Sequence, residues 1–367
     1  MKRLSLYAAL LAAVLGLSGC ELLDQAVSNT GTAKETQAQS EQSVAIDTED
    51  GIPFIETQAE NDSTESDLTA STESEAEADF MVVPDTEYAS EAAAETEAET
   101  EAESLPEPVK TAVAQVISSH EAVGEHWAVG YEDLETGEVC GYHDSDVMQS
   151  ASVVKLFIMG AVYRYMCYPE EGEEVIPFGE EYDGQLREVI GKMITVSDNE
   201  ASNLLVDRLG GGDFKKGAQL VAEFCKENGY TGTSIGRRFL ESNPTGDNYT
   251  TAADTRKFLS DIYHGKLINE EASAKMLEFV KGQTVKHKIP AGLPEGFTSG
   301  NKTGEMPEGY NLGCIENDVA IVFPPEGMGE GYVLTVLSND LAGRNNEAGE
   351  AIKQISSLTA QWYQQSR

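Results

Sequence analysis

The order in which strand and helix patterns follow one another limits this chain to few folds. Strand patterns fall into two groups, separated by a long middle block: 127–133 and 139–142, then 297–303, 318–323 and 332–338. Helical patterns begin near Pro108 and end the chain over 347–364. We therefore expect an α+β fold, in which an antiparallel sheet is flanked by the N- and C-terminal helices and joined by an all-helical subdomain.

The middle block contains only helical patterns. The first begins near Ser152, runs for about 15 residues and is apolar on almost every side, so it should be buried. The remaining patterns cover 186–195, 200–209, 214–228, 255–264 and 270–282.

The N-terminus has the composition of a targeting segment. Met1-Lys2-Arg3 precedes an apolar run that is short for a membrane span, which indicates a signal peptide over 1–19. Leu17-Ser18-Gly19-Cys20 resembles the bacterial lipobox, in which cleavage precedes a cysteine that is then lipidated. We expect Cys20 to be lipidated and the protein to be extracytoplasmic and anchored to the bacterial cell membrane. The alternative is plain secretion with an incidental cysteine.

Residues 20–108 are unusually acidic. Between Glu21 and Pro108 there are 25 Asp or Glu residues and a single basic residue, Lys34. Such a segment buries too little apolar surface to offset its chain entropy, so a disordered acidic linker is predicted. It is either a spacer between membrane and domain or a charged tail with no selected reach.

The remaining residues, 109–367, are predicted to form one folded domain. They carry 39 acidic and 22 basic residues, a net charge of about −17, which argues against a nucleic-acid partner. The histidines show no metal-ligand spacing, so neither a metal nor a cofactor is expected, and a monomer is assumed. The cysteines fit no metal pattern and are either disulfide-bonded or buried thiols: Cys140, Cys167, Cys225 and Cys314.

Ser152 and Lys155 form the first of three short motifs that carry chemistry. A hydroxyl needs a nearby base to act as a nucleophile at neutral pH. Three residues apart at a helix start, the two side chains lie on one face, and burial disfavours the charged form of Lys155. Ser299-Gly300-Asn301-Lys302 has the same spacing, but its glycine and its strand setting do not align the pair.

The second motif, Ser197-Asp198-Asn199, lies between two predicted helices. Ser197 could relay a proton to a leaving nitrogen, and Asn199 could hold a substrate amide or Lys155. The alternative is a helix N-cap, because Ser, Asp and Asn are favoured capping residues.

The third motif, Lys302-Thr303-Gly304, ends a strand. Lys302 and Thr303 could bind a substrate carboxylate, and Gly304 would leave room for a ligand along the strand edge. The alternative is a surface turn.

In this order, the three motifs resemble the class A β-lactamases and their relatives among penicillin-recognising serine hydrolases. The resemblance extends to Ser197–Gly211 and Asn317–Pro325 and covers most of 109–367. It implies a small-molecule substrate, a β-lactam or a D-alanyl peptide.

The resemblance also implies a role for each motif residue. Ser152 would be the acylated nucleophile, Lys155 its base and Ser197 a proton relay. Asn199 would position the substrate. Lys302 and Thr303 would bind its carboxylate beside Gly304. Backbone N–H groups of Ser152 and of a residue just past Gly304 would hold the oxyanion.

The chain departs from the family pattern where a glutamate should activate the deacylating water. Glu241 is the candidate, but its loop is shorter than usual and the family's spacing is not kept. The alternative is an exposed glutamate paired with Arg237 or Arg238.

Three functions therefore remain open: a β-lactamase, a D-alanyl peptidase or penicillin-binding protein that deacylates slowly, and a catalytically silent wall-binding domain. A fourth reading rests on Gly232-Thr233-Ser234-Ile235-Gly236, which matches the nucleophile elbow of α/β hydrolases. It lacks the buried strand before the serine and the apolar helix after it.

Overall fold

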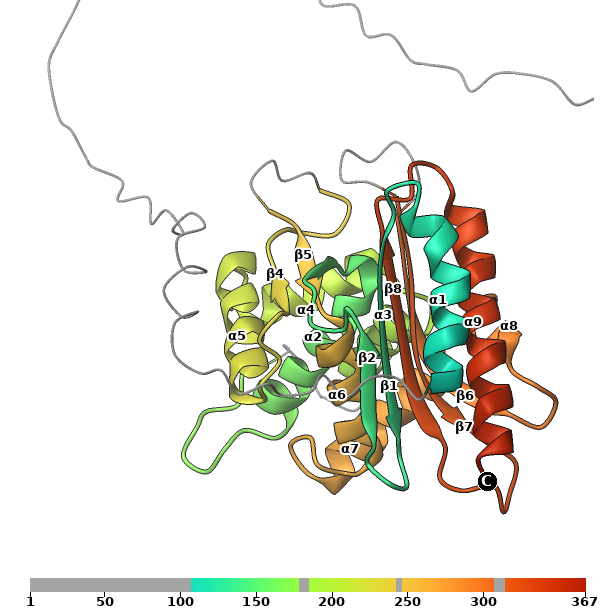
Figure 1. Cartoon of the computed structure of the whole chain (residues 1–367). Coiled ribbons are helices and arrows are strands. Elements are labelled where there is room, and N and C mark those ends of the chain that lie inside the picture. Colours follow the sequence, from blue (N-terminus) through green and yellow to red (C-terminus); the bar gives the residue numbers. More distant parts are fainter. Residues whose placement is uncertain (1–106, 178–184, 242–245, 307–313) are drawn as a thin grey trace, which may run out of the picture. The chain divides into compact units, whose positions relative to one another are not determined.

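The computed structural model describes residues 107–177, 185–241, 246–306 and 314–367 (Figure 1). Its centre is a five-stranded antiparallel sheet in the order β2-β1-β8-β7-β6. The strands are β1 (His126–Asp133), β2 (Val139–Tyr142), β6 (Thr298–Met306), β7 (Ile315–Phe323) and β8 (Tyr332–Asn339). The two groups of strand patterns thus share one sheet, with β1 paired to β8, which confirms the predicted α+β fold.

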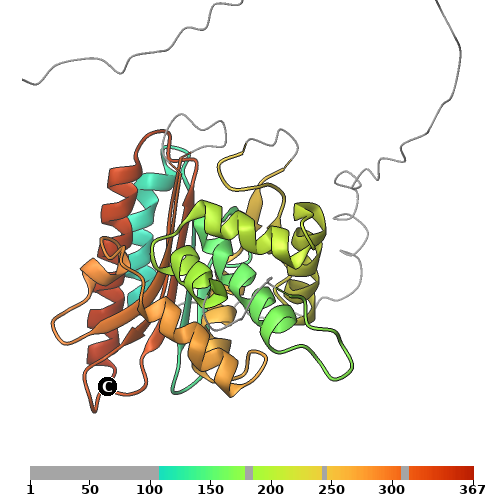
Figure 2. The same ribbon diagram turned by 180° about the vertical axis from the view of Figure 1, so that it is seen from behind.

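One face of the sheet is covered by helices from both ends of the described chain. Helices α1 (Glu107–Glu121) and α9 (Asn345–Gln365) lie side by side there (Figures 1 and 2), and the short α8 (Ile289–Gly292) packs against α9. Alternate strand residues such as Leu334 and Val336 join the apolar side of α9 in this part of the core.

The opposite face packs against the helical block. The intervening residues of the same strands, including Val319, Ile321, Val333 and Leu337, belong to this second part of the core. Because both faces are covered, the central strands are apolar at nearly every position. The block comprises α2 (Lys155–Val162), α3 (Gln185–Thr195), α4 (Asn199–Leu209), α5 (Phe214–Glu227), α6 (Ala252–Tyr263) and α7 (Glu270–Lys281).

The helix predicted to begin near Ser152 consists of three continuous parts. A 3₁₀ turn (Ala151–Val154) leads into α2, and a π-helical turn (Tyr163–Cys167) follows. Every residue of α2 is buried, as its lack of a polar face predicted. Phe157 packs edge-on against Tyr230 and Phe258, which fixes the helix inside the block.

A second, three-stranded sheet was not predicted. It has the order β3-β5-β4, from β3 (Met148–Gln149), β4 (Ser234–Ile235) and β5 (Asn248–Thr250). Strands of two or three residues are too short to produce a recognisable alternation. Ser234 is exposed on β4, so the strand-to-helix elbow of an α/β hydrolase is not formed there.

Several predictions fall on residues outside the described part of the chain. The signal peptide, Cys20 and almost all of the 20–108 linker lie there, and those assignments stay predictions. Within the described residues, no helix combines the length and apolar character needed to cross a membrane. Cys225 and Cys314 are buried thiols without a disulfide.

Candidate active site

Ser152 lies in the 3₁₀ turn that precedes α2 and is half-buried. Residues three apart eclipse one another in a 3₁₀ turn, so Ser152 and Lys155 share a side of it. The residue before the serine, Ala151, has a left-handed backbone with φ 44°. The Asn317 side chain of β7 donates to the carbonyl of Ser150 at 3.2 Å, which anchors the segment to the sheet.

Lys155 is fully buried and close to the second motif. Its Nζ donates to the Ser197 carbonyl at 2.6 Å and to Asn199 Oδ1 at 2.7 Å, and it lies 3.3 Å from Ser197 Oγ. Burial, and then the neighbouring Lys302 charge, lower the pKa of Lys155 to about 6, although Asp198 opposes them. Lys155 is therefore mostly a neutral amine at pH 7. Its two N–H groups are used in the two short bonds, which leaves the lone pair to accept a proton.

The second motif combines a cap with a site. Asp198 is the N-cap of α4, since its carboxylate accepts from the Ala201 N–H at 2.7 Å. Ser197 has a left-handed backbone with φ 59°, and Asn199 begins the helix. The capping alternative is thus correct for Asp198, while its two neighbours contact Lys155. Left-handed non-glycine residues are strained and occur preferentially at functional sites.

Lys302 approaches Ser197 from the sheet. It is fully buried on β6, and its Nζ donates to Ser197 Oγ at 2.9 Å and to the Thr303 carbonyl at 2.7 Å. Burial lowers the pKa of Lys302 to about 7 and Lys288 adds to this, while Asp318 and Glu305 act in the opposite direction. The Ser197 hydroxyl therefore lies between two buried amines, an arrangement suited to passing a proton.

Gly304 is where β6 touches the turn that carries Ser152. A Cβ atom at this position would stand 2.6 Å from the Ser150 carbonyl oxygen and 3.2 Å from the Ser152 nitrogen. Any larger residue would push the strand away from the turn that carries Ser152. Thr303, beside it, is buried, with 3% exposure.

The structure thus brings the three motifs together. Lys155, Ser197, Asn199 and Lys302 are in direct contact, and Gly304 packs against the backbone at Ser152. Among the described residues, none forms a hydrogen bond with the Ser152 hydroxyl. Catalytic hydrogen bonds often tighten only once substrate is bound, so this geometry remains compatible with proton transfer.

Glu241 does not join this cluster. Its side chain is 64% exposed, and its carboxylate lies 4.0 Å from Arg238 Nε. Its backbone carbonyl accepts from Arg237 at 3.2 Å. This arrangement corresponds to the alternative considered for Glu241, an exposed glutamate beside Arg237 and Arg238.

Phe239 is the site residue that the sequence did not reveal. Its buried ring lies 4.6 Å from Lys155 Nζ, measured to the ring centroid. The Asn203 side chain holds its backbone, accepting from the Phe239 N–H at 2.9 Å and donating to its carbonyl at 3.2 Å. An apolar ring therefore covers this side of the amine, and no pattern around Phe239 marked it in advance.

A third buried lysine, Lys288, lies beyond Gly304, and the sequence did not reveal it either. Lys288 Nζ contacts Glu305 at 2.8 Å and Glu316 at 2.7 Å, and His287 lies 3.4 Å from Glu305. The carboxylates of Glu316, Asp318 and Glu305 outweigh burial and raise the pKa of Lys288. The sequence around Lys288 contains no motif that predicts these ion pairs, because the partners of Lys288 lie on β6 and β7.

Comparison with protein families and curated proteins gives consistent matches. A family model described as the β-lactamase enzyme family matches residues 108–167 and 170–363. Beta-lactamase 3 of Bacillus cereus is 27% identical over 225 residues, 56% of this chain and 67% of that protein. Beta-lactamase FAR-1 of Nocardia farcinica is 27% identical over 248 residues, 62% of this chain and 75% of that protein. A β-lactamase of Citrobacter koseri is 31% identical over 146 residues, only 46% of its length.

Solved structures show the same fold. A β-lactamase from Sphaerobacter thermophilus aligns with a TM-score of 0.57 at 23% identity, covering 70% of this chain and 97% of that one. A mutant of PBP-A, in an acyl-enzyme complex with penicillin-G, aligns with a TM-score of 0.56 at 23% identity, over 71% of this chain and 100% of its own. At these identities the likeness supports the architecture and no more.

Proposed function

The chain belongs to the β-lactamase enzyme family and is a serine β-lactamase-like hydrolase, and we propose that it opens β-lactam rings through an acyl-enzyme formed on Ser152. The observation that carries the proposal is the Ser197 hydroxyl, which lies 2.9 Å from Lys302 Nζ and 3.3 Å from Lys155 Nζ. These contacts join a base, a relay and a cation beside one half-buried serine.

In the proposed reaction, the neutral Lys155 amine takes the proton of Ser152 Oγ as that oxygen bonds to the lactam carbonyl carbon. Backbone N–H groups at Ser152 and just past Gly304 stabilise the oxyanion. The carbon–nitrogen bond then breaks, and Ser197 passes the proton from Lys155 to the leaving nitrogen. Water later releases the acyl group and regenerates the Ser152 hydroxyl.

Substrate is proposed to be held by the other motif residues. Lys302 and Thr303 bind a substrate carboxylate, and Asn199 positions an amide of the substrate. Because Lys302 is also the amine closest to the Ser197 hydroxyl, substrate binding and the proton relay depend on the same cation.

Intact mass spectrometry after brief exposure to penicillin tests the proposal. We expect a one-to-one adduct that forms quickly and then decays, and no adduct with Ser152→Ala. Repeated turnover of a chromogenic cephalosporin would accompany the decay. Absence of any adduct from the correctly folded protein would contradict the proposal and leave a catalytically silent wall-binding domain.

A second candidate, a D-alanyl peptidase or penicillin-binding protein with slow deacylation, is favoured by one specific observation. The side of Lys155 nearest the loop carries the Phe239 ring, and the Glu241 carboxylate is exposed beside Arg238. Neither arrangement supplies a carboxylate to activate water. In this case the ring still opens, but the adduct on Ser152 persists.

Two variants separate the candidates. If Glu241 activates the water, Glu241→Gln should convert a decaying adduct into a stable one. If no residue does so, Glu241→Gln should change nothing, and Phe239→Glu should shorten the lifetime of the adduct by placing a carboxylate near Lys155. Glu295→Gln, which changes an exposed glutamate outside the motifs, is the matched control.

We also propose that the mature protein is extracytoplasmic and tethered to the membrane by a lipid on Cys20. The support is the sequence Leu17-Ser18-Gly19-Cys20 after an apolar run. Labelling with a radioactive fatty acid should mark the wild-type chain and not Cys20→Ala, which should leave the membrane fraction. Equal labelling of both would contradict the tether.

A further inference from the structure

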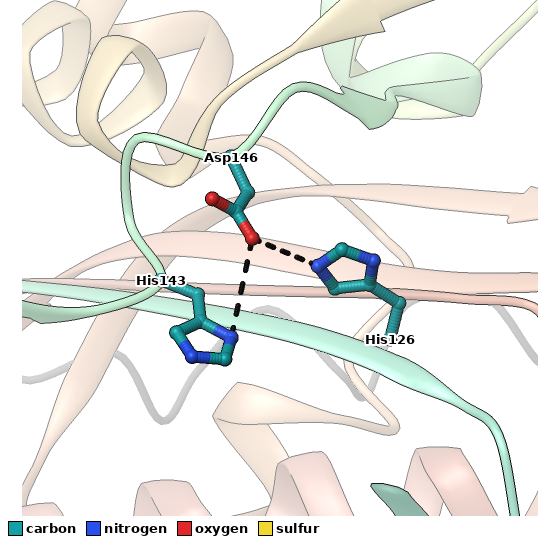
Figure 3. Close-up of side chains that lie close together, drawn as sticks. All are labelled: His126, His143 and Asp146. Atoms are coloured by element: carbon teal, nitrogen blue, oxygen red, sulfur yellow. Dashed lines mark hydrogen bonds and ion pairs between the residues drawn. The ribbon is translucent and has the colours of Figure 1, made fainter.

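Two histidines and an aspartate from two segments of the chain lie close together (Figure 3). His126 is the first residue of β1, His143 follows β2, and Asp146 lies in the loop that leads to β3. His126 Nε2 is 2.9 Å from Asp146 Oδ2, and His143 Nδ1 is 4.0 Å from the same oxygen. All three donor atoms lie within 4.8 Å of one another.

We propose that His126, His143 and Asp146 form a binding site for a divalent transition metal, with zinc as the best-suited ion. Two imidazole nitrogens and a carboxylate oxygen are a donor set that zinc accepts, whereas calcium and magnesium prefer oxygen ligands alone. The three protein donors would leave the remaining position to water or to a group from outside.

The donor atoms need to move only a short way. Ligand bonds of zinc are about 2.0–2.2 Å long, so donors in a tetrahedral shell stand roughly 3.3 Å apart. The side chains are 45%, 50% and 46% exposed for His126, His143 and Asp146, so their outer atoms can rotate to this spacing without disturbing the core. The exposure also gives the ion a direct path from solvent.

The surroundings already orient one of the histidines. The backbone of His143 is left-handed with φ 48°, and its carbonyl accepts from the Asp146 N–H at 3.0 Å. The His143 ring stacks on Tyr142, with centroids 4.2 Å apart, and the Tyr142 hydroxyl donates to Glu121 of α1 at 2.8 Å. Groups that hold a ligand in this way strengthen metal binding.

These three residues are better suited to bind a metal ion than the other comparable group among the described residues, formed by His287, Glu305 and Glu316. There the Lys288 ammonium already stands between the two carboxylates, so an incoming cation would have to displace it. In the described part of the chain, no lysine or arginine forms an ion pair with Asp146. The expectation of no metal depended on sequence spacing, and His126 and His143 are too far apart in the chain to show one.

Calorimetric titration of the full chain with zinc chloride tests the site. We expect one site of defined stoichiometry above the weak background of the acidic residues. His126→Ala and Asp146→Asn should each lower its affinity by more than tenfold, since replacing even a supporting residue costs about 10–100-fold. The control His264→Ala removes an exposed histidine elsewhere and should leave the affinity unchanged.

The proposal would be overturned by wild-type affinity in both ligand variants, or by the absence of any site above background in the wild type. Loss of the site in His287→Ala with retention in His126→Ala would assign the ion to the other group and would equally overturn it. Circular dichroism of each variant checks the fold. A zinc-dependent rise of the melting temperature in the wild type, absent in His126→Ala, provides a readout independent of hydrolase activity.

Discussion

The two sides of strand β6 hold fully buried lysines in opposite electrostatic settings. On the side of the helical block, Lys155 and Lys302 both contact the Ser197 hydroxyl and each donates to a backbone carbonyl, and no carboxylate of the described residues is bonded to either amine. On the other side, Lys288 lies between Glu305 and Glu316. The pKa values of Lys155 and Lys302 are lowered to about 6 and about 7, whereas that of Lys288 is raised.

The comparison shows that burial alone does not decide what a lysine does. Removing an amine from water disfavours its charged form, and only nearby negative charge reverses the effect. A lysine bonded to neutral oxygens loses its proton more readily, and a lysine bonded to carboxylates remains a fixed cation. The neutral partners of Lys155 and Lys302 are therefore as important to the proposed chemistry as the lysines themselves.

The largest effect is expected from Lys155→Met, which removes the base and keeps the approximate volume. Acylation by penicillin should slow by about 10²–10⁴-fold, the usual contribution of a general base. Rapid-quench mass spectrometry measures the rate, with Ser152→Ala as the zero point. An acylation rate close to that of the wild type would mean that Lys155 is not the base.

The next largest effect is expected from Lys288→Met, and it should appear in stability. Breaking a buried ion pair by removing one partner costs about 3–5 kcal/mol, because the remaining charge stays uncompensated. Urea denaturation measures the loss of unfolding free energy. The double variant with Glu316→Gln should recover much of that loss, and failure to recover any would mean that the pairing is not its cause.

The pH dependence of acylation should reveal the lowered pKa of Lys155. An ammonium cannot accept a proton, so the acylation rate should rise with pH and level off above about 6, as Lys155 loses its proton. Because Lys302 helps to lower the pKa of Lys155, Lys302→Met should move the rise to higher pH. A rise at the same pH in both proteins would contradict the coupling.

The contribution of Lys155 to the free energy of unfolding should also increase with pH. The pKa of Lys155 is about 6 in the folded state and 10.5 as an ordinary value, so the unfolded chain binds more protons between those limits. The contribution of this residue to the free energy of unfolding should therefore increase as the pH rises from about 6 towards 10.5. In Lys155→Met this part of the dependence should disappear from urea denaturation curves measured over that range.

The smallest effect is expected from Glu305→Gln. The Glu305 side chain is 41% exposed, while that of Glu316 is only 12% exposed. Because water reaches the Glu305 carboxylate and Glu316 still pairs with the lysine, the loss of unfolding free energy should not exceed what an exposed ion pair contributes, about 0.2–1 kcal/mol. A loss as large as that of Lys288→Met would show that Glu305, and not Glu316, is the main partner of the lysine.

Much of the architecture was readable from local patterns, and the errors have identifiable causes. Helix α6 begins at Ala252, earlier than predicted, because the Thr251 hydroxyl caps it by accepting from the Asp254 N–H. Strand β7 begins at Ile315, where polar residues hid the strand pattern. Glu316 pairs there with Lys288. The buried Asn317 side chain donates hydrogen bonds to backbone carbonyls of the segment before Ser152. Both errors arise where a polar side chain has a specific partner.

The sequence by itself determined the order of the three motifs, the α+β architecture and the burial of the helix after Ser152, because each of these depends on residue types at short, regular spacing. Only the tertiary structure decided which groups surround those motifs. It brought Phe239 over Lys155, two glutamates onto Lys288, and His126 to the loop that carries His143 and Asp146. These contacts join distant segments, and the electrostatic character of a buried side chain depends on what those segments bring beside it.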